Sequence, residues 1–121
     1  MGILVLFKNL KTINGIYQND YRKKIIHINE NLDHYLKRQV CAHELGHAVL
    51  HKSINSFFWD KCTFMLTNKI EVEANLFAAE LLIKDDDIIS NYGHNLEYIA
   101  ACCCVTENLV EYKLRLFHKN I

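Results

Sequence analysis

His43, Glu44 and His47 form an H-E-x-x-H sequence, the most chemically specific pattern in this 121-residue chain. Residues four apart lie on one face of an α-helix, so the two imidazoles can bind one metal ion. Glu44 is turned by about 100° around the helix axis and can reach a water molecule beside that ion without being a ligand. The pattern therefore indicates zinc-dependent hydrolysis, with Glu44 as the general base that accepts the proton of the water.

An amphipathic helix from about residue 33 to residue 52 must carry this motif, because apolar and histidine side chains recur there every three or four residues. These residues are Leu36, Val40, His43, His47 and Leu50. Asn29, Asn31 and Asp33 precede the helix and offer acceptors for its N-cap. Gly46 costs up to about 1 kcal/mol relative to Ala in mid-helix, and a small residue there permits close approach of another backbone.

A catalytic zinc site normally has three protein ligands and one open position, so a third ligand is needed. His51 does not qualify, because His43 and His51 are separated by about 12 Å of helix rise. The segment 71–82 is the best source, since it is rich in Ala and Leu and has a helical composition. Glu71, Glu73 and Glu80 border its apolar stripe, and spacing alone leaves the choice among these carboxylates open.

The chain resembles the ImmA/IrrE family of metallopeptidases. The resemblance is carried by the His43–His51 run, by the E-x-E-A-N-x-F-A-A-x-L-L sequence at residues 71–82, and by weaker similarity over roughly residues 12–117. It implies that Glu73, the glutamate before Ala-Asn, is the third zinc ligand, with Glu71 as the alternative. It also implies cleavage of helix-turn-helix transcriptional repressors encoded by phages and mobile elements, which relieves repression.

Two departures from the family pattern concern the surroundings of the site. The second motif is not followed by a proline, and the chain opens almost directly on an apolar segment at residues 3–7. The first departure affects a loop, and the second affects a wall of the substrate site.

Length and composition predict a single domain over residues 1–121 of a small cytosolic enzyme, and the motifs and the resemblance imply that it is a metallopeptidase domain. Fourteen basic residues balance fourteen acidic ones, which gives no basic patch for direct nucleic-acid binding. The apolar N-terminal run is too short to span a membrane. Five cysteines, three of them adjacent at residues 102–104, form a poor disulfide framework and favour a reducing compartment.

The order of elements predicts an α+β fold, in which a small N-terminal antiparallel sheet packs on the motif helix and on a C-terminal set of helices. We expect a strand near residues 3–7, a hairpin over 15–29 that turns around Asn19-Asp20, and a short strand at 63–66. Further helices are expected over residues 71–82, 85–91, 95–103 and 106–118.

Several other residues have candidate roles. Tyr92 or His94 could stabilise the oxyanion of a tetrahedral intermediate, and the aromatic run at 57–59 is expected to close the core beneath a long connection. Asn75, Glu71 and Glu80 could bind the free nitrogens of the two ligand imidazoles. His27 has no motif partner and is expected to be an ordinary strand residue.

Three functions are consistent with these residues. The first is a zinc-dependent endopeptidase with His43, His47 and Glu73 as ligands and a protein substrate. The second is a zinc-binding regulator that sequesters a repressor without cutting it, although such a protein has no need of Glu44. The third is a metal-free relic, in which the same side chains only form hydrogen bonds.

Overall fold

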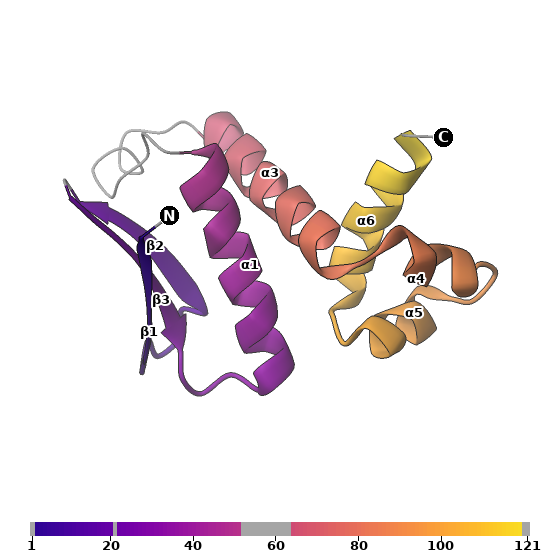
Figure 1. Ribbon diagram of the computed structural model, residues 1–121, viewed down its shortest axis with the longest axis horizontal. Helices are drawn as coiled ribbons and strands as arrows, with labels where there is room; N and C mark the ends of the chain where they lie inside the picture. Colours follow the sequence, from indigo (N-terminus) through magenta and orange to yellow (C-terminus); the bar gives the residue numbers. More distant parts are fainter. Residues whose placement is uncertain (1, 21, 52–63, 120–121) are drawn as a thin grey trace.

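The computed structural model describes residues 2–20, 22–51 and 64–119. In these described segments, three strands come first and five helices follow, which confirms the α+β class (Figure 1). The elements are β1 (Ile3–Lys8), β2 (Gly15–Asp20), β3 (Lys23–Asn29), α1 (His34–Leu50), α3 (Phe64–Leu82), α4 (Asp85–Ser90), α5 (Leu96–Cys103) and α6 (Glu107–Lys119). The sheet lies at one end of the molecule, α1 and α3 lie beside it in turn, and α4, α5 and α6 form the opposite end.

The sheet is mixed, whereas the sequence predicts an antiparallel one. The strand order is β1-β3-β2, and β2 pairs antiparallel with β3 as the predicted hairpin, with Asp20 opposite Lys23. β1 pairs parallel with β3, with Ile3 opposite Lys24. The place beside β1 is thus taken by β3 and not by β2, so β2 is an edge strand of the sheet.

One face of the sheet packs against α1. Tyr17 of β2 and Ile26 and Ile28 of β3 are buried and form one core cluster with Ala48 of α1. Alternate residues of a strand face the same side, so Ile26 and Ile28 share the face toward the helix. The sheet thereby supports the helix that carries the H-E-x-x-H motif.

Helix α1 begins as predicted, because Oδ1 of Asp33 accepts a hydrogen bond from the backbone N–H of Leu36 at 2.9 Å. Gly46 faces α3, where a Cβ atom would lie 3.2 Å from both Cα and O of Ala74. The absence of a side chain at Gly46 lets the two helices approach closely, as expected for a small residue at this position.

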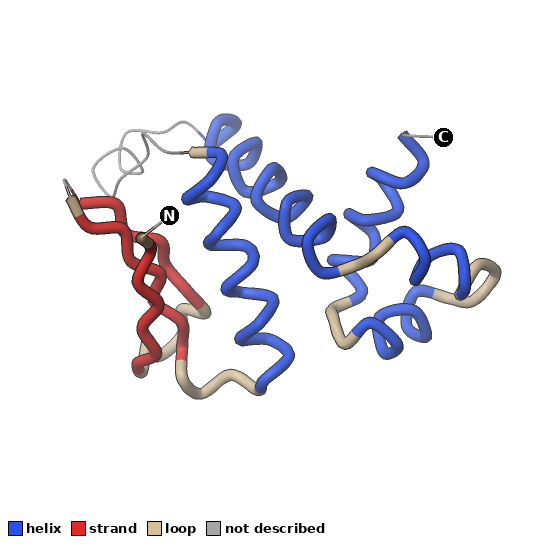
Figure 2. The backbone as a smooth tube through the Cα atoms, viewed as in Figure 1, coloured by secondary structure: helices blue, strands red, loops and turns tan. Residues whose placement is uncertain are grey.

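The helices α3 to α6 follow one another away from the sheet (Figure 2), and together with α1 they form a second core cluster. Its buried members are Ala42, Ala78, Ala79, Ile83, Ile88, Ile99, Ala100, Leu109 and Val110. Lys113 of α6 is also buried, and its Nζ lies 3.1 Å from Oε2 of Glu80 and 2.7 Å from Oδ1 of Asp85. This lysine therefore ties α6 to the end of α3 and to the start of α4.

The predicted helices after the motif are confirmed to within a few residues at α4, α5 and α6. The predicted strand at 63–66 is wrong over its described part, because Phe64 begins α3, which starts well before the predicted residue 71. The aromatic run at 57–59 lies outside the described residues. Within the described part of the chain, no helix has both the length and the apolar character needed to cross a membrane.

Candidate metal centre

His43 and His47 lie one helical turn apart on α1, with ring centroids separated by 4.9 Å. The His47 side chain is only 5% exposed, and that of His43 is 19% exposed. The helix places both imidazoles on the same side, as their spacing predicts. The structure thus presents two nitrogen donors from a partly buried helix face.

The third member of the group is Glu71 of α3. One carboxylate oxygen lies 2.8 Å from Nε2 of His43, and the other lies 3.1 Å from Nε2 of His47. Donor atoms of these three residues all lie within 4.8 Å of one another. Two imidazole nitrogens and one carboxylate oxygen form the donor set of a catalytic zinc site, so the residues present fit a zinc ion.

Glu73, the ligand expected from the family resemblance, does not belong to this group. Its nearest oxygen lies 3.9 Å from Nε2 of His51. Residues two apart on a helix differ by about 200° in direction, so only one of Glu71 and Glu73 can face the imidazole pair. Glu71, the alternative in the sequence prediction, occupies the place expected for Glu73.

A signal in the sequence could have favoured Glu71. Asn75 follows Glu71 by four residues and therefore shares its helix face. In the structure, Oδ1 of Asn75 lies 2.8 Å from Nδ1 of His43. Asn75 was expected as a possible partner of one of the two imidazoles, and the structure shows it bound to His43, whereas Glu80 binds Lys113 instead.

Glu44 is buried beside the three donors without being one of them. The backbone of Tyr17 provides a hydrogen bond to its carboxylate, which links α1 to the edge strand β2. Burial raises the pKa of Glu44 above its ordinary value, while the neighbouring His43 and His47 oppose this shift. A carboxylate with a raised pKa is a stronger base, which suits it to accept a proton from water.

His43 and Glu71 shift each other's pKa. Burial alone lowers the pKa of His43, but the hydrogen bond that His43 donates to Glu71 and the charges of Glu44 and Glu71 outweigh it, so the pKa is raised. Burial alone raises the pKa of Glu71, but hydrogen bonds with His43 and His47 lower it to about 2. In the metal-free chain, Glu71 is therefore a carboxylate over the whole neutral range.

A cleft of about 430 Å³ adjoins Glu44, His47 and Glu71. Four consecutive residues of β2, Gly15 to Gln18, line it. His27 lines it as well, with its Nε2 2.7 Å from Oε1 of Gln18. His27 was expected to be an ordinary strand residue, and no motif partner in the sequence indicates its place at the cleft.

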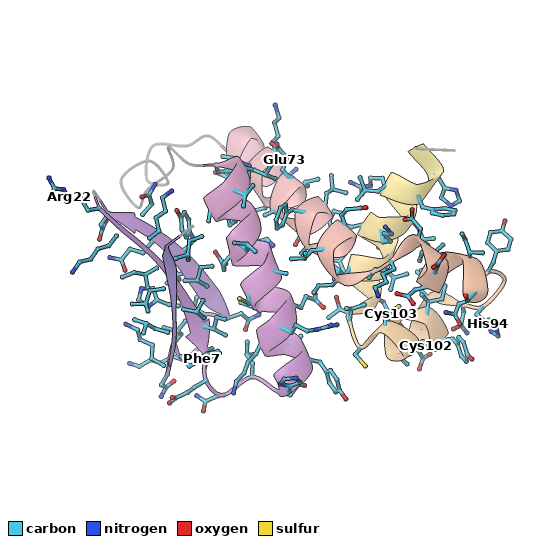
Figure 3. The ribbon with its side chains drawn as sticks, viewed as in Figure 1. Phe7, Arg22, Glu73, His94, Cys102 and Cys103 are labelled. Atoms are coloured by element: carbon cyan, nitrogen blue, oxygen red, sulfur yellow. The ribbon has the colours of Figure 1, made fainter. Side chains whose placement is uncertain are left out.

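The two candidates for oxyanion stabilisation are not among the residues that line this cleft. Tyr92 is 79% exposed in the connection after α4. His94 stacks on Tyr98 of α5 with ring centroids 4.1 Å apart, at the end of the molecule formed by α4 and α5 (Figure 3). Neither residue belongs to the group of metal-ligating side chains.

The cysteine run also lies away from the metal centre. Figure 3 places Cys102 and Cys103 at the end of α5, in the half of the molecule opposite the sheet. Cys41, Cys102, Cys103 and Cys104 are free thiols.

The fold and the site together define a metallopeptidase of the IrrE N-terminal-like domain family (Peptidase M78), which matches residues 1–115, and the chain belongs to this family. The family predicted from the two motifs is thereby confirmed.

Two relatives make the comparison more specific. The chain is 40% identical over 118 residues to Metallopeptidase ImmA of Bacillus subtilis (strain 168), across 93% of this chain and 69% of that protein. It is 48% identical over 80 residues to Uncharacterized immunity region protein 2 of Bacillus phage phi105, across 66% of this chain and 50% of that protein. The chain is thus a homologue of a metallopeptidase and carries a His-His-Glu candidate metal site.

Proposed function

We propose that the chain is a zinc-dependent endopeptidase in which His43, His47 and Glu71 hold the metal and Glu44 is the general base. The observation that carries this proposal is the convergence of three donors from two helices within 4.8 Å, with a buried glutamate beside them. Three protein donors leave one coordination position for a reactant, as catalytic zinc sites require.

The hydrogen bond of His43 supports this assignment of donors. The side-chain carbonyl oxygen of Asn75 can only accept, so Nδ1 of His43 carries a proton, which leaves Nε2 as the nitrogen that would bind the metal in place of its own proton. A bound zinc ion supplies Lewis-acid chemistry, which makes water nucleophilic near neutral pH and polarises a peptide carbonyl.

The carboxylate of Glu44 then takes part in two successive proton transfers. It accepts the proton of the attacking water and passes it to the nitrogen of the departing amine, so that the peptide bond breaks with a neutral leaving group. Its hydrogen bond from the Tyr17 backbone holds the carboxylate in place, and its burial raises its pKa toward the range in which both transfers are efficient.

The substrate is a protein segment bound in the cleft that β2 lines. β2 pairs only with β3 among the described strands, so its other edge is available to an extended peptide. Backbone hydrogen bonds along Gly15–Gln18 would hold such a segment beside Glu44 with little dependence on its side chains.

We further propose that this protein substrate is a helix-turn-helix transcriptional repressor, cleaved at a specific site in the cytoplasm. The family resemblance supports this substrate, and one relative carries the name of a phage immunity region protein. The free thiols of the described part of the chain fit a reducing compartment.

The test combines zinc content with cleavage of the repressor encoded beside the gene of this chain. We expect Glu44→Gln to retain zinc and lose cleavage, and His47→Ala to lose both. Glu111→Gln is the matched control, because it removes the same charge from an exposed position of α6. Continued cleavage by Glu44→Gln contradicts the proposed mechanism, and an intact repressor under every inducing condition contradicts the proposed substrate.

The same variant separates the second function from the first. A regulator that binds zinc and sequesters a repressor would act equally well with Glu44→Gln. The buried position of Glu44 and its hydrogen bond to β2 favour the hydrolase, since a binding protein gains nothing from a buried carboxylate of raised pKa.

A further inference from the structure

A third histidine, His51, lies beside the metal centre without belonging to it. It is 8% exposed and directly follows α1, where its backbone N–H donates to the carbonyl of His47 at 2.9 Å. Its Nδ1 lies 3.0 Å from Nδ1 of His47, and the two ring centroids are 5.2 Å apart. The residue is too far along the helix to share a metal ion with His43, so its contact with His47 needs another explanation.

The two ligand imidazoles have corresponding arrangements. Each directs Nε2 toward Glu71, and each directs Nδ1 toward a side chain behind it. For His43 the side chain behind is Asn75, and for His47 it is His51. The side-chain oxygen of Asn75 can only accept a hydrogen bond, whereas His51 accepts at Nδ1 only if its own proton lies on Nε2.

The proton positions of the second pair follow from the proposed function, on which this inference rests. Nε2 of His47 must be unprotonated to bind a metal ion, so Nδ1 of His47 carries the proton. That proton is donated to Nδ1 of His51 across 3.0 Å. The proton of His51 therefore lies on Nε2, which faces Oε1 of Glu73 at 3.9 Å.

Glu73 favours this arrangement through its charge. The 3.9 Å separation is longer than a hydrogen bond, and Nε2 of His51 is buried without a hydrogen-bond partner in the described part of the chain. A carboxylate at that distance attracts the positive end of an N–H group and disfavours a nitrogen lone pair in the same place. Glu73 lies midway along α3, and Figure 3 shows it near the C-terminal end of α1.

We infer that His51 and Glu73 are positioning residues, which form a chain behind His47 that orients its ring and keeps its proton on Nδ1. Neither residue is a ligand. Glu71 and Glu73, two residues apart on α3, thus have separate roles. Glu71 is one of the three proposed metal ligands, whereas Glu73 acts on His47 through His51.

Zinc affinity of the full-length chain, measured by competition with a chromophoric chelator, tests this inference. Loss of a partner behind a ligand imidazole typically weakens metal affinity by about 10- to 100-fold. We expect this loss in His51→Phe, which keeps the ring and removes the acceptor. His34→Phe is the matched control, because His34 is exposed at the first position of the same helix, at the end away from His51.

Rescue by a conservative variant distinguishes positioning from mere packing. His51→Asn retains an acceptor at the δ position, as Asn75 does for His43, so we expect its zinc affinity to stay within about threefold of the original chain. His51→Leu, which fills space without an acceptor, should behave like His51→Phe. Equal zinc affinities for the Asn and Leu variants would overturn the inference.

A second measurement needs no variant. In the zinc-loaded original chain, ¹⁵N chemical shifts of the histidine rings should place the proton of His51 on Nε2 and that of His47 on Nδ1. A His51 proton on Nδ1 would overturn the inference even if the variants failed to fold. An original chain that binds no zinc contradicts the proposed function itself, whereas zinc binding that is unchanged in His51→Phe refutes only the role of His51.

Discussion

One carboxylate oxygen of Glu71 lies 2.8 Å from Nε2 of His43, although the two residues are 28 positions apart and belong to different helices. The other oxygen of the same carboxylate lies 3.1 Å from Nε2 of His47. This relationship distinguishes Glu71 from every other acidic residue in the described part of the chain, because only Glu71 groups with both imidazoles.

The third ligand can be tested by the same substitution at two positions. Glu71→Gln removes the carboxylate from the group and should weaken zinc affinity by more than about 100-fold, because a neutral amide is a poor zinc ligand. Glu73→Gln makes the identical change two residues later and should weaken it by less than about tenfold. Calorimetric zinc titration of both variants checks the assignment, and the reverse order of affinities would restore Glu73 as the ligand.

The pH dependence of stability in the zinc-free chain follows from His43 and Glu71. The folded-state pKa of Glu71 is lowered from 4.5 to about 2, so its contribution is present above about pH 4.5 and is lost as the pH falls toward 2. The folded-state pKa of His43 is raised, so its contribution is present below about pH 6.5 and is lost as the pH rises through the raised value.

Urea unfolding with a chelator present should therefore show the largest difference between the original chain and Glu71→Gln between about pH 4.5 and 6.5. The size of that difference stays modest, because 42% of the Glu71 side chain is exposed to screening solvent. A difference that is constant from about pH 3 to 8 would show that the ion pair does not form in the metal-free chain.

Gly46→Ala should weaken zinc binding while changing the free energy of unfolding only slightly. Alanine gains up to about 1 kcal/mol of helix propensity, but its Cβ would lie 3.2 Å from two backbone atoms of Ala74 and from Cβ of Phe77. Helix α3 must shift to relieve these contacts, which moves Glu71 and Asn75 relative to the histidines. We expect a change in unfolding free energy of less than about 1 kcal/mol together with weaker zinc binding, measured on the same sample.

Lys113→Met should destabilise the chain without affecting zinc affinity. The lysine is 1% exposed, and Asp85 and Glu80 raise its pKa against the opposing effect of burial. Its two partner carboxylates are mostly exposed and remain hydrated when it is removed, so the loss should be about 1–2 kcal/mol rather than more. Lys69→Met, at an exposed position of α3, is the control. A Lys113→Met chain as stable as the original would show that the buried ion pair contributes no net stability.

Local sequence patterns predict α1 and its histidines well, because the spacing of His43 and His47 determines which face of the helix they share. The same patterns do not choose between Glu71 and Glu73, which both border the apolar stripe of α3. That choice depends on how α3 is rotated about its own axis, and hence on how α3 packs against α1, where Gly46 closely approaches Ala74. The choice between Glu71 and Glu73 therefore depends on tertiary packing, which local sequence patterns do not describe.

The sequence does not determine the direction of β1 for a similar reason. The apolar run at residues 3–7 indicates a strand, but nothing in it indicates whether it pairs with β2 or with β3. The structure pairs it with β3, in parallel, and leaves β2 at the edge. The cleft beside the metal centre depends on that placement, since β2 lines it.

The two core clusters meet along α1, where Ala42 packs with the C-terminal helices and Ala48 packs with the sheet. His43 and His47 lie between these two alanines. Partial opening of either half of the molecule would thus disturb at least one histidine, so a cation held at this boundary would couple the two halves into one cooperative unit. Amide hydrogen exchange in the sheet and in the distant C-terminal helices should slow together when zinc is added.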